Sequence, residues 1–406
     1  CALYTTPHKP HNSTQVGILS HMKVSENPFR ASLGSTPPLL VGREEVIDDF
    51  RLALSEGPGA HERVSLLVGG RGVGKTVLLN ELEEVAHNQG WLTFSETATH
   101  GFVANLREQI ANYLTRFEGN RGRTSWQLSV PYLSVKREGA KQKELPNSLR
   151  FLLTELLDRL EENDRFNETG TGVLITIDEL HYVHQDEIIE FATTIQHLIR
   201  ENREIAVVLA GIPTSIRPLL ASDEGRNPIT FLRRANRVDL GRLRDEEVEE
   251  GLSVPAQQAG LPWEDEALEL AVTASGGYPF MIQLIGSYAW RYETGAAITY
   301  DSASKGITRA RKQLGQSVHE PALNDLSAED RRFLAAMSLD DGPSRITDIA
   351  RRLEVSDQQA YNYRRRLYEA DMVSNDRGMA DFVLPYLREY LRDHFVADLL
   401  RIPDEK

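Results

Sequence analysis

The chain has 406 residues, of which 40% are hydrophobic and 26% are charged, and its formal net charge at pH 7 is −14. This length exceeds what one ordinary hydrophobic core organises, so we expect two or three domains. The negative balance disfavours indiscriminate binding to nucleic acid or membrane surfaces, although it leaves room for one locally basic face.

The cysteine count and the hydropathy narrow the classes further. Cys1 is the only cysteine, which excludes disulfides within the chain and cysteine-based metal sites. No apolar run approaches the length of a membrane-spanning helix, and no secretory leader is recognisable. We therefore expect a soluble, cytoplasmic protein without membrane contact. Residues 1–21, which run up to Met22 through Ser20 and His21, indicate an expression tag or linker and are set aside.

The strongest signal along the chain is a glycine-rich turn between a strand and a helix. Residues 64–80 read VSLLVGGRGVGKTVLLN, with an apolar run before the turn and apolar residues at helical spacing after it. The turn fits G-x-x-x-x-G-K-[ST], in which glycines let backbone N–H groups point at phosphate oxygens. Lys75 would reach the β and γ phosphates, and the Thr76 hydroxyl would bind Mg²⁺. The predicted phosphate site consists of Gly69, Gly70, Arg71, Gly72, Val73, Gly74, Lys75, Thr76 and Val77.

An acidic strand end supplies the partner that such a P-loop requires. Residues 173–179 read VLITIDE, a buried strand that ends in Asp178 and Glu179. Asp178 is placed to hold Mg²⁺ through water, and Glu179 to take a proton from the attacking water as a general base. A carboxylate pair alone would be weak evidence, but together with the P-loop it predicts a site for ATP or ADP with Mg²⁺.

Further strands and helices alternate around these two motifs. Alternation of this kind predicts an α/β fold with a mostly parallel sheet and a ligand site at the carboxyl ends of the strands. Residues 120–143 show strand alternation that ends in basic residues, which predicts either an insertion that contacts DNA or a partner, or a solvated hairpin. The predicted strands span 91–96, 205–213 and 236–240, and the predicted helices span 104–117 and 148–162.

The pattern changes again in residues 319–406. Three helices, at 328–339, 346–353 and 357–370, precede a hairpin whose turn is Asn375 to Gly378. Ser356 and Gln359 fit a capping box, which sets the start of the third helix. Helix, helix, turn, helix and hairpin in this order predict a winged helix.

The third of these helices carries three adjacent arginines. Its predicted core side consists of Ala360, Tyr363, Leu367 and Ala370. From Arg345 to Arg366, six basic residues stand against three acidic ones, a local charge of +3. A DNA contact, a protein contact and a merely solvated helix remain open. The predicted DNA contacts are Gln358, Tyr361, Asn362, Arg364, Arg365, Arg366 and, in the following turn, Arg377.

From about Asn27 onward the chain resembles AAA+ ATPases, in particular the branch shared by origin-binding initiators and signal-transduction ATPases. The segment PLLVGREEVIDDF resembles that family's adenine-side segment, which implies that Val41, Gly42 and Arg43 cover the base. The segment FLRRANRVDL resembles the place of the family's arginine finger. The resemblance implies that Arg233 or Arg234 acts on the γ phosphate, within one subunit or between neighbours.

The resemblance extends to a helical lid over residues 243–318. The segment SGGYPF resembles an element of the signal-transduction branch, which implies that Tyr278 and Pro279 lie near the base. Two features depart from many AAA+ enzymes. The expected lid arginine is absent, and the fourth strand leads to Thr214 instead of ending in the usual polar sensor. These departures imply slow hydrolysis, with nucleotide acting as a conformational switch.

These features together predict an ATP-binding, slowly hydrolysing ATPase with a P-loop core (22–242), an all-helical lid (243–318) and a C-terminal winged helix (319–406). Its nucleotide state would control how the winged helix engages double-stranded DNA. One alternative is a switch of signalling or defence type, whose winged helix contacts protein. Another is a loader or motor that works as a homo-oligomeric ring.

Overall fold

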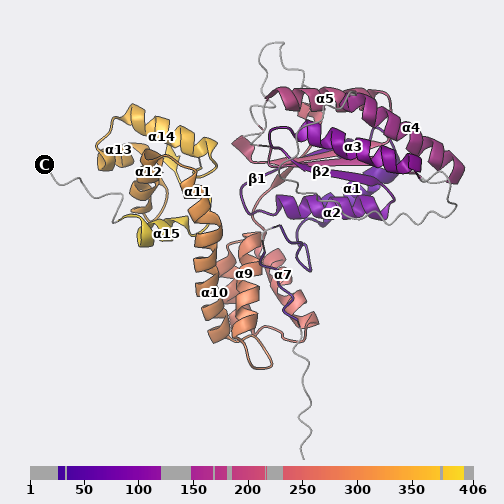
Figure 1. Cartoon of the computed structure of the whole chain (residues 1–406). Helices are drawn as coiled ribbons and strands as arrows, with labels where there is room; N and C mark the ends of the chain where they lie inside the picture. The colour runs from indigo at the N-terminus through magenta and orange to yellow at the C-terminus, as the bar shows by residue number, and fades with distance from the viewer. Residues whose placement is uncertain are drawn as a thin grey trace, which may run out of the picture.

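The structure, a computed structural model, describes residues 26–32, 34–119, 148–167, 170–180, 185–214, 216, 232–374 and 378–396. Within them the chain forms an α/β core, a group of lid helices and a C-terminal group of shorter helices (Figure 1). The predicted tag, the predicted insertion at 120–143 and Arg377 lie outside the described residues. None of the helices in the described part has the length and apolar character that a membrane crossing needs.

One sheet of five parallel strands organises the core, in the order β2-β3-β4-β1-β5. The strands are β1 (Val64–Gly69), β2 (Leu92–Thr97), β3 (Val173–Asp178), β4 (Ile205–Gly211) and β5 (Asn236–Leu240). The central strands are buried almost throughout, as expected for parallel strands covered by helices on both faces. The predicted α/β class with a parallel sheet is therefore confirmed. Because only β4 separates β1 from β3, the P-loop strand and the acidic strand end near each other.

Helices cover both faces of the sheet (Figure 1). The alternation of side chains along β1 explains why both faces are apolar. Leu67 belongs to one buried cluster with Leu78 of the following helix, whereas Leu66 and Val68 belong to a second cluster. The first face is covered by α1 (Glu44–Glu56) and α2 (Lys75–Asn88), and the second by α3 (Phe102–Gly119), α4 (Leu149–Asn167) and α5 (Gln185–Arg200).

The lid follows β5 and is helical, as predicted for this part of the chain. Gly306 lets two of its helices approach closely, because a Cβ atom there would lie 2.7 Å from the backbone nitrogen of Ala289. The lid helices are α7 (Asp245–Gln258), α8 (Asp265–Ser275), α9 (Pro279–Tyr292) and α10 (Tyr300–Leu314).

A continuous helical path joins the lid to the C-terminal group. α10 runs through a π-helical turn, η4 (Gly315–His319), into α11 (Glu320–Asn324), so the predicted boundary at 318/319 falls inside this path. The elements beyond it are α12 (Ala328–Ser338), β6 (Ser344–Arg345), α13 (Ile346–Leu353), α14 (Asp357–Glu369), β7 (Met379–Ala380) and α15 (Leu387–His394).

The C-terminal group follows the predicted order of elements. The capping box at the start of α14 is present, with Ser356 and Gln359 bonding each other's backbone N–H groups. β6 and β7 pair in antiparallel fashion, and a further bridge joins Val373 to Phe382. The hairpin after α14 is therefore short.

Candidate nucleotide-binding site

The P-loop connects the carboxyl end of β1 to the first residue of α2. Gly72 and Gly74 have φ angles of 76° and 96°, a left-handed backbone that favours glycine over residues with a Cβ atom. Gly74 is the residue before α2, so the turn leads directly into a helix N-terminus, where free N–H groups and the helix dipole attract anions.

Lys75 is the first residue of α2 and its side chain is buried, with 8% of its surface exposed. Its ammonium donates to the carbonyl oxygens of Gly69, at 2.9 Å, and Gly70, at 2.8 Å. Burial lowers the pKa of Lys75, whereas the nearby carboxylates of Glu179 and Asp178 act in the opposite direction. The loop therefore holds a cation at its own centre.

Thr76 and Asp178 meet across the strand ends. The Thr76 hydroxyl donates to Asp178 Oδ2 at 2.6 Å. Burial raises the pKa of Asp178, and the hydrogen bond from Thr76 opposes that rise. A hydroxyl beside a carboxylate is a donor set suited to a hard cation such as Mg²⁺. The structure thus brings the two predicted metal-binding residues together.

Glu179 follows β3 with a φ angle of 60°, which is uncommon for a residue other than glycine. Its backbone N–H donates to Asp178 Oδ1 at 2.7 Å. A left-handed glutamate directly after an acidic strand end is the kind of local strain that gathers at functional sites. It turns the chain so that Glu179 lines the same cavity as Lys75 and Thr76.

That cavity has a volume of about 470 Å³ and lies between the P-loop and the lid. This size is typical of a site for a small ligand. Among the predicted residues, the cavity is lined by Val41, Arg43, Arg71, Gly72, Val73, Gly74, Lys75, Thr76, Val77, Glu179 and Pro279. Sequence reasoning missed other lining residues, among them Arg30, Gln283 and Asp325, because no local motif marks them.

The predicted base-side residues take two different positions. Arg43 donates to the carbonyl oxygens of Gly42, at 2.9 Å, and Gly241, at 3.0 Å. Burial lowers the pKa of Arg43. Tyr278, by contrast, packs on the P-loop: its hydroxyl donates to the Arg71 carbonyl oxygen at 2.7 Å. It therefore links the lid to the phosphate turn, while the neighbouring Pro279 lines the cavity.

The two candidate finger arginines lie at the other edge of the sheet. They precede β5, whose first residue, Asn236, pairs with Ser65 near the start of β1. With about 3.3 Å per strand residue, this places them roughly 16 Å from the P-loop end of the strand. Contact with the nucleotide of the same chain is therefore ruled out in this arrangement, and only action on a neighbouring copy remains for Arg233 or Arg234.

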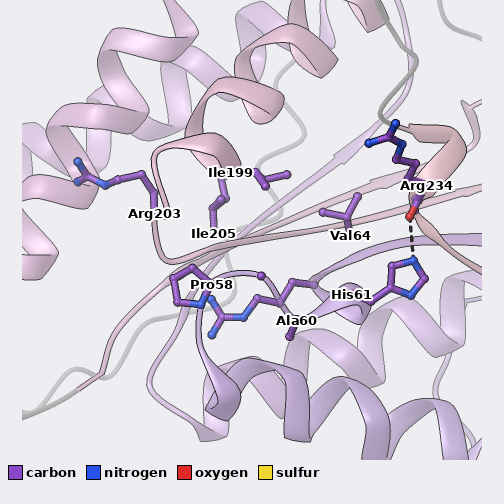
Figure 2. Close-up of a pocket in the computed structure, with 11 residues that line it drawn as sticks. Pro58, Ala60, His61, Val64, Ile199, Arg203, Ile205 and Arg234 are labelled. Carbon is purple, nitrogen blue, oxygen red and sulfur yellow. Dashed lines mark hydrogen bonds between the residues drawn. The ribbon is translucent and has the colours of Figure 1, made fainter.

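Figure 2 shows the surroundings of Arg234 at that edge. A smaller cavity, of about 220 Å³, lies beside the short helix η1 (His61–Arg63). His61 Nε2 donates to the Arg234 carbonyl oxygen at 2.8 Å, and the Arg234 side chain is exposed. This contact fixes the backbone of the segment before β5 and leaves the guanidinium at the surface.

Thr214, considered as a substitute for the polar sensor, contacts the C-terminal group instead. Its hydroxyl donates to the Glu369 carbonyl oxygen, in the last turn of α14, at 2.8 Å. This hydrogen bond ties the end of the segment after β4 to the end of α14.

The residues predicted for DNA contact divide into two sets. Gln358, Tyr361, Asn362 and Arg365 are exposed on α14, as expected. Arg366 instead forms an ion pair with Asp330 of α12 at 2.6 Å, and Arg364 lies over the Tyr361 ring. The predicted core side is confirmed for Ala360 and Leu367, which are buried.

The local positive charge that the sequence predicts is largely neutralised within the chain. Four of the six arginines counted there form ion pairs, and three of their four carboxylate partners lie outside the counted stretch. The pairs are Arg351–Asp348, Arg352–Asp340, Arg365–Glu369 and Arg366–Asp330. The expectation of a strongly basic face is therefore corrected to a mixed one, with Arg365, at 70% exposure, as its most open member among these four apart from Arg351.

Comparisons with known proteins agree with this geometry. Residues 39–209 match the family described as "AAA ATPase domain", and residues 316–391 match a "Domain of unknown function (DUF8462)". The first match covers the P-loop and the acidic strand, so this part of the chain is an AAA ATPase domain. No curated protein matches the chain in sequence.

Three solved structures resemble the chain in fold. A Walker-type ATPase of Pyrococcus abyssi matches with 17% identity and a TM-score of 0.62, over 87% of this chain and 96% of that one. A single-residue variant of RuvB from Thermotoga maritima matches with 16% identity and a TM-score of 0.45, over 90% and 98%. Cdc6p of Pyrobaculum aerophilum matches with 14% identity and a TM-score of 0.44, over 91% and 97%.

Proposed function

We propose that the AAA ATPase domain of this chain binds ATP with Mg²⁺ and hydrolyses it slowly, and that the nucleotide state governs what the C-terminal group contacts. One observation carries the nucleotide part. Lys75, Thr76 and Glu179 converge on one cavity at the carboxyl ends of the parallel strands, where open α/β sheets bind ligands.

Each of these side chains has a defined task in this proposal. Lys75 would exchange its carbonyl partners for β and γ phosphate oxygens, keeping its charge paired. Thr76 and Asp178 would hold Mg²⁺, whose chemistry is to neutralise phosphate charge when it is bound. The described residues contain no group of three or more His, Cys, Asp or Glu side chains suited to a metal, which agrees with a Mg²⁺ ion held jointly with phosphate.

Glu179 supplies the proton acceptor for hydrolysis. Its carboxylate would take the proton of a water whose oxygen attacks the γ phosphorus, while the bond to the ADP oxygen breaks. Slow turnover is expected because Arg233 and Arg234 lie at the far edge of the sheet and Thr214 is bonded to α14. A second copy of the chain would have to supply the arginine.

Calorimetric titration with ATP and Mg²⁺ tests the binding site. Lys75→Ala should weaken ATP binding by roughly 100-fold or more, because a buried charge pair loses its cation. Lys305→Ala is the matched control, since Lys305 is exposed on α10 and pairs only with Asp301 among the described residues. Equal ATP affinity in the wild type and Lys75→Ala would refute the assignment of this cavity to nucleotide.

For the C-terminal group we propose a winged helix that reads double-stranded DNA through the exposed side of α14. The order of its elements and the exposed Gln358, Tyr361, Asn362 and Arg365 support this role. Binding to duplex DNA should then fall steeply with salt and depend on added nucleotide.

A protein-contacting switch is the second candidate, and two observations favour it. The arginines of α13 and α14 are largely paired with carboxylates of the same chain, and Glu369 is bonded to Thr214 of the core. Absence of duplex binding at low salt, with and without ATP, would eliminate the DNA reader and leave this candidate.

A further inference from the structure

The turn after α14 places a carboxylate of the C-terminal group against the P-loop. Asp371 is only 9% exposed although it carries a charge. A Cβ atom built on Gly70 would lie 3.1 Å from Asp371 Oδ2, so the side chain stands directly over the backbone of the loop. Asp371 thus lies on a surface that Lys75 and Arg71 make positive.

The surroundings of Asp371 are those of a bound anion. The Arg71 backbone N–H is hydrogen-bonded to its carboxylate, and the charges of Lys75 and Arg71 favour its ionised form. Burial has the larger effect and raises the pKa of Asp371. Oδ2 is buried and has no hydrogen-bond partner among the described residues. A backbone N–H and a lysine ammonium are also the groups with which a P-loop holds phosphate.

The backbone of Asp371 is strained as well. Its φ angle is 57°, at the position after the α14 cap where glycine or asparagine is usual. The turn is held by hydrogen bonds from Asp371 N to the Tyr368 carbonyl oxygen, at 3.1 Å, and from Met372 N to that of Leu367, at 2.9 Å. An aspartate that is both strained and desolvated here is compensated by what its carboxylate faces.

Other contacts seat the same surface on the core. Thr214 donates to the Glu369 carbonyl oxygen at 2.8 Å, and Arg242 to that of Val383 at 3.4 Å. Three points of contact around the P-loop therefore belong to one turn and the hairpin beside it. The connection to the lid through η4 lies elsewhere, so these contacts can open while the chain remains joined.

We infer that the Asp371 carboxylate takes a phosphate position on the P-loop, so that nucleotide binding and the seated C-terminal group exclude each other. This inference rests on the proposed nucleotide function and names the residue through which the nucleotide state reaches the C-terminal group. Two anions cannot share one lysine and one turn at low cost, so a bound triphosphate releases the turn after α14.

Removing the charge of Asp371 tests this competition. Asp371→Asn keeps the shape and suits the left-handed backbone, and Asp371→Gly removes the side chain at a position that favours glycine. Both should bind ATP more tightly than the wild type, by roughly 5- to 150-fold, the range of typical coupling between sites. Asp393→Asn is the matched control, because it removes an exposed carboxylate from the same C-terminal group. Melting temperatures establish that every variant is folded.

A distance measurement tests the release itself. In a Cys1→Ser background, cysteines at Leu52 on α1 and Leu339 after α12, both exposed, accept a fluorescence donor and acceptor. Energy transfer should change when ATP and Mg²⁺ are added to the wild type. In Asp371→Gly it should be shifted toward the ATP value before any nucleotide is added.

The outcomes separate the two proposals. ATP binding of equal strength in the wild type and both Asp371 variants would overturn the inference and leave the nucleotide site intact. Unchanged energy transfer on saturation with ATP would overturn it too. If no variant, including those at Asp371, binds ATP, the nucleotide function itself is refuted, and the competition with it.

Discussion

The P-loop and α14 both present cations in an acidic chain, but they hold them in different ways. Lys75 is buried, and carbonyl groups of its own loop receive its charge. Arg366 lies at the surface and is paired with Asp330, 36 positions away in the sequence. A phosphate site is thus built by local backbone, whereas the charge of a surface helix depends on what folds beside it.

The largest effect is expected on the P-loop side of this comparison. Glu179→Gln should slow ATP hydrolysis by about 100-fold or more, because an amide cannot accept the proton of the attacking water. ATP affinity should stay close to that of the wild type, since the phosphate contacts remain. Phosphate release under saturating ATP measures the rate, and exposed Glu269→Gln is the control. A wild-type rate in Glu179→Gln would remove Glu179 from the catalytic role.

The difference between the two regions also explains what could be predicted. The strand, the turn and the helix of the P-loop are contiguous, so spacing alone places Lys75 and Thr76. Asp178 was predictable because the ends of neighbouring parallel strands meet at one edge of a sheet. The role of Tyr278 on the loop was not, since its hydroxyl bonds a carbonyl 207 positions away.

The same reasoning accounts for the error on α14. Counting charges between Arg345 and Arg366 omits Asp330, Asp340 and Glu369, which fold back onto that stretch. Asp371 was missed for a related reason. An aspartate after a helix is typical of a turn, and only the tertiary structure brings it to Gly70. Contacts between distant segments, rather than local propensity, decide both cases.

A buried histidine beside the C-terminal group offers the next effect in size. His319 is 1% exposed, and its Nε2 donates to the Pro385 carbonyl oxygen at 2.9 Å. Burial lowers the pKa of His319 to about 4, and this hydrogen bond opposes the decrease. Its Nδ1 has no hydrogen-bond partner among the described residues, so a proton there would be a buried, unpaired charge.

Acid should therefore destabilise this contact. Between the usual histidine pKa and about pH 4, the unfolded chain binds a proton that the folded chain excludes. Stability is fully present above pH 6.5 and falls as the pH drops through this window, by roughly 2 to 3 kcal/mol. Chemical denaturation at pH 7 and pH 4.5 measures it in the wild type and His319→Gln. An identical pH dependence in both proteins would show that His319 contributes nothing to it.

The smallest effects separate two adjacent arginines of α14. Arg366→Ala should lower the free energy of unfolding by about 1 kcal/mol, because Asp330, at 7% exposure, loses its partner. Arg365→Ala should change it by less than about 0.5 kcal/mol, since Arg365 is 70% exposed and 3.9 Å from Glu369. Urea denaturation of the two variants measures both.

DNA binding should rank the same two variants in the opposite order if α14 reads a duplex. Arg365→Ala should then weaken binding to the preferred site by about 1 to 3 kcal/mol and relax sequence preference, because the exposed guanidinium is available to base edges. Arg366→Ala should weaken it less, since Asp330 already engages that charge. Titrations on specific and scrambled duplexes at several salt concentrations give both quantities. Equal losses in the two variants, or a larger loss for Arg366→Ala on every duplex, would mean that the exposed side of α14 does not read sequence and that its arginines serve the fold.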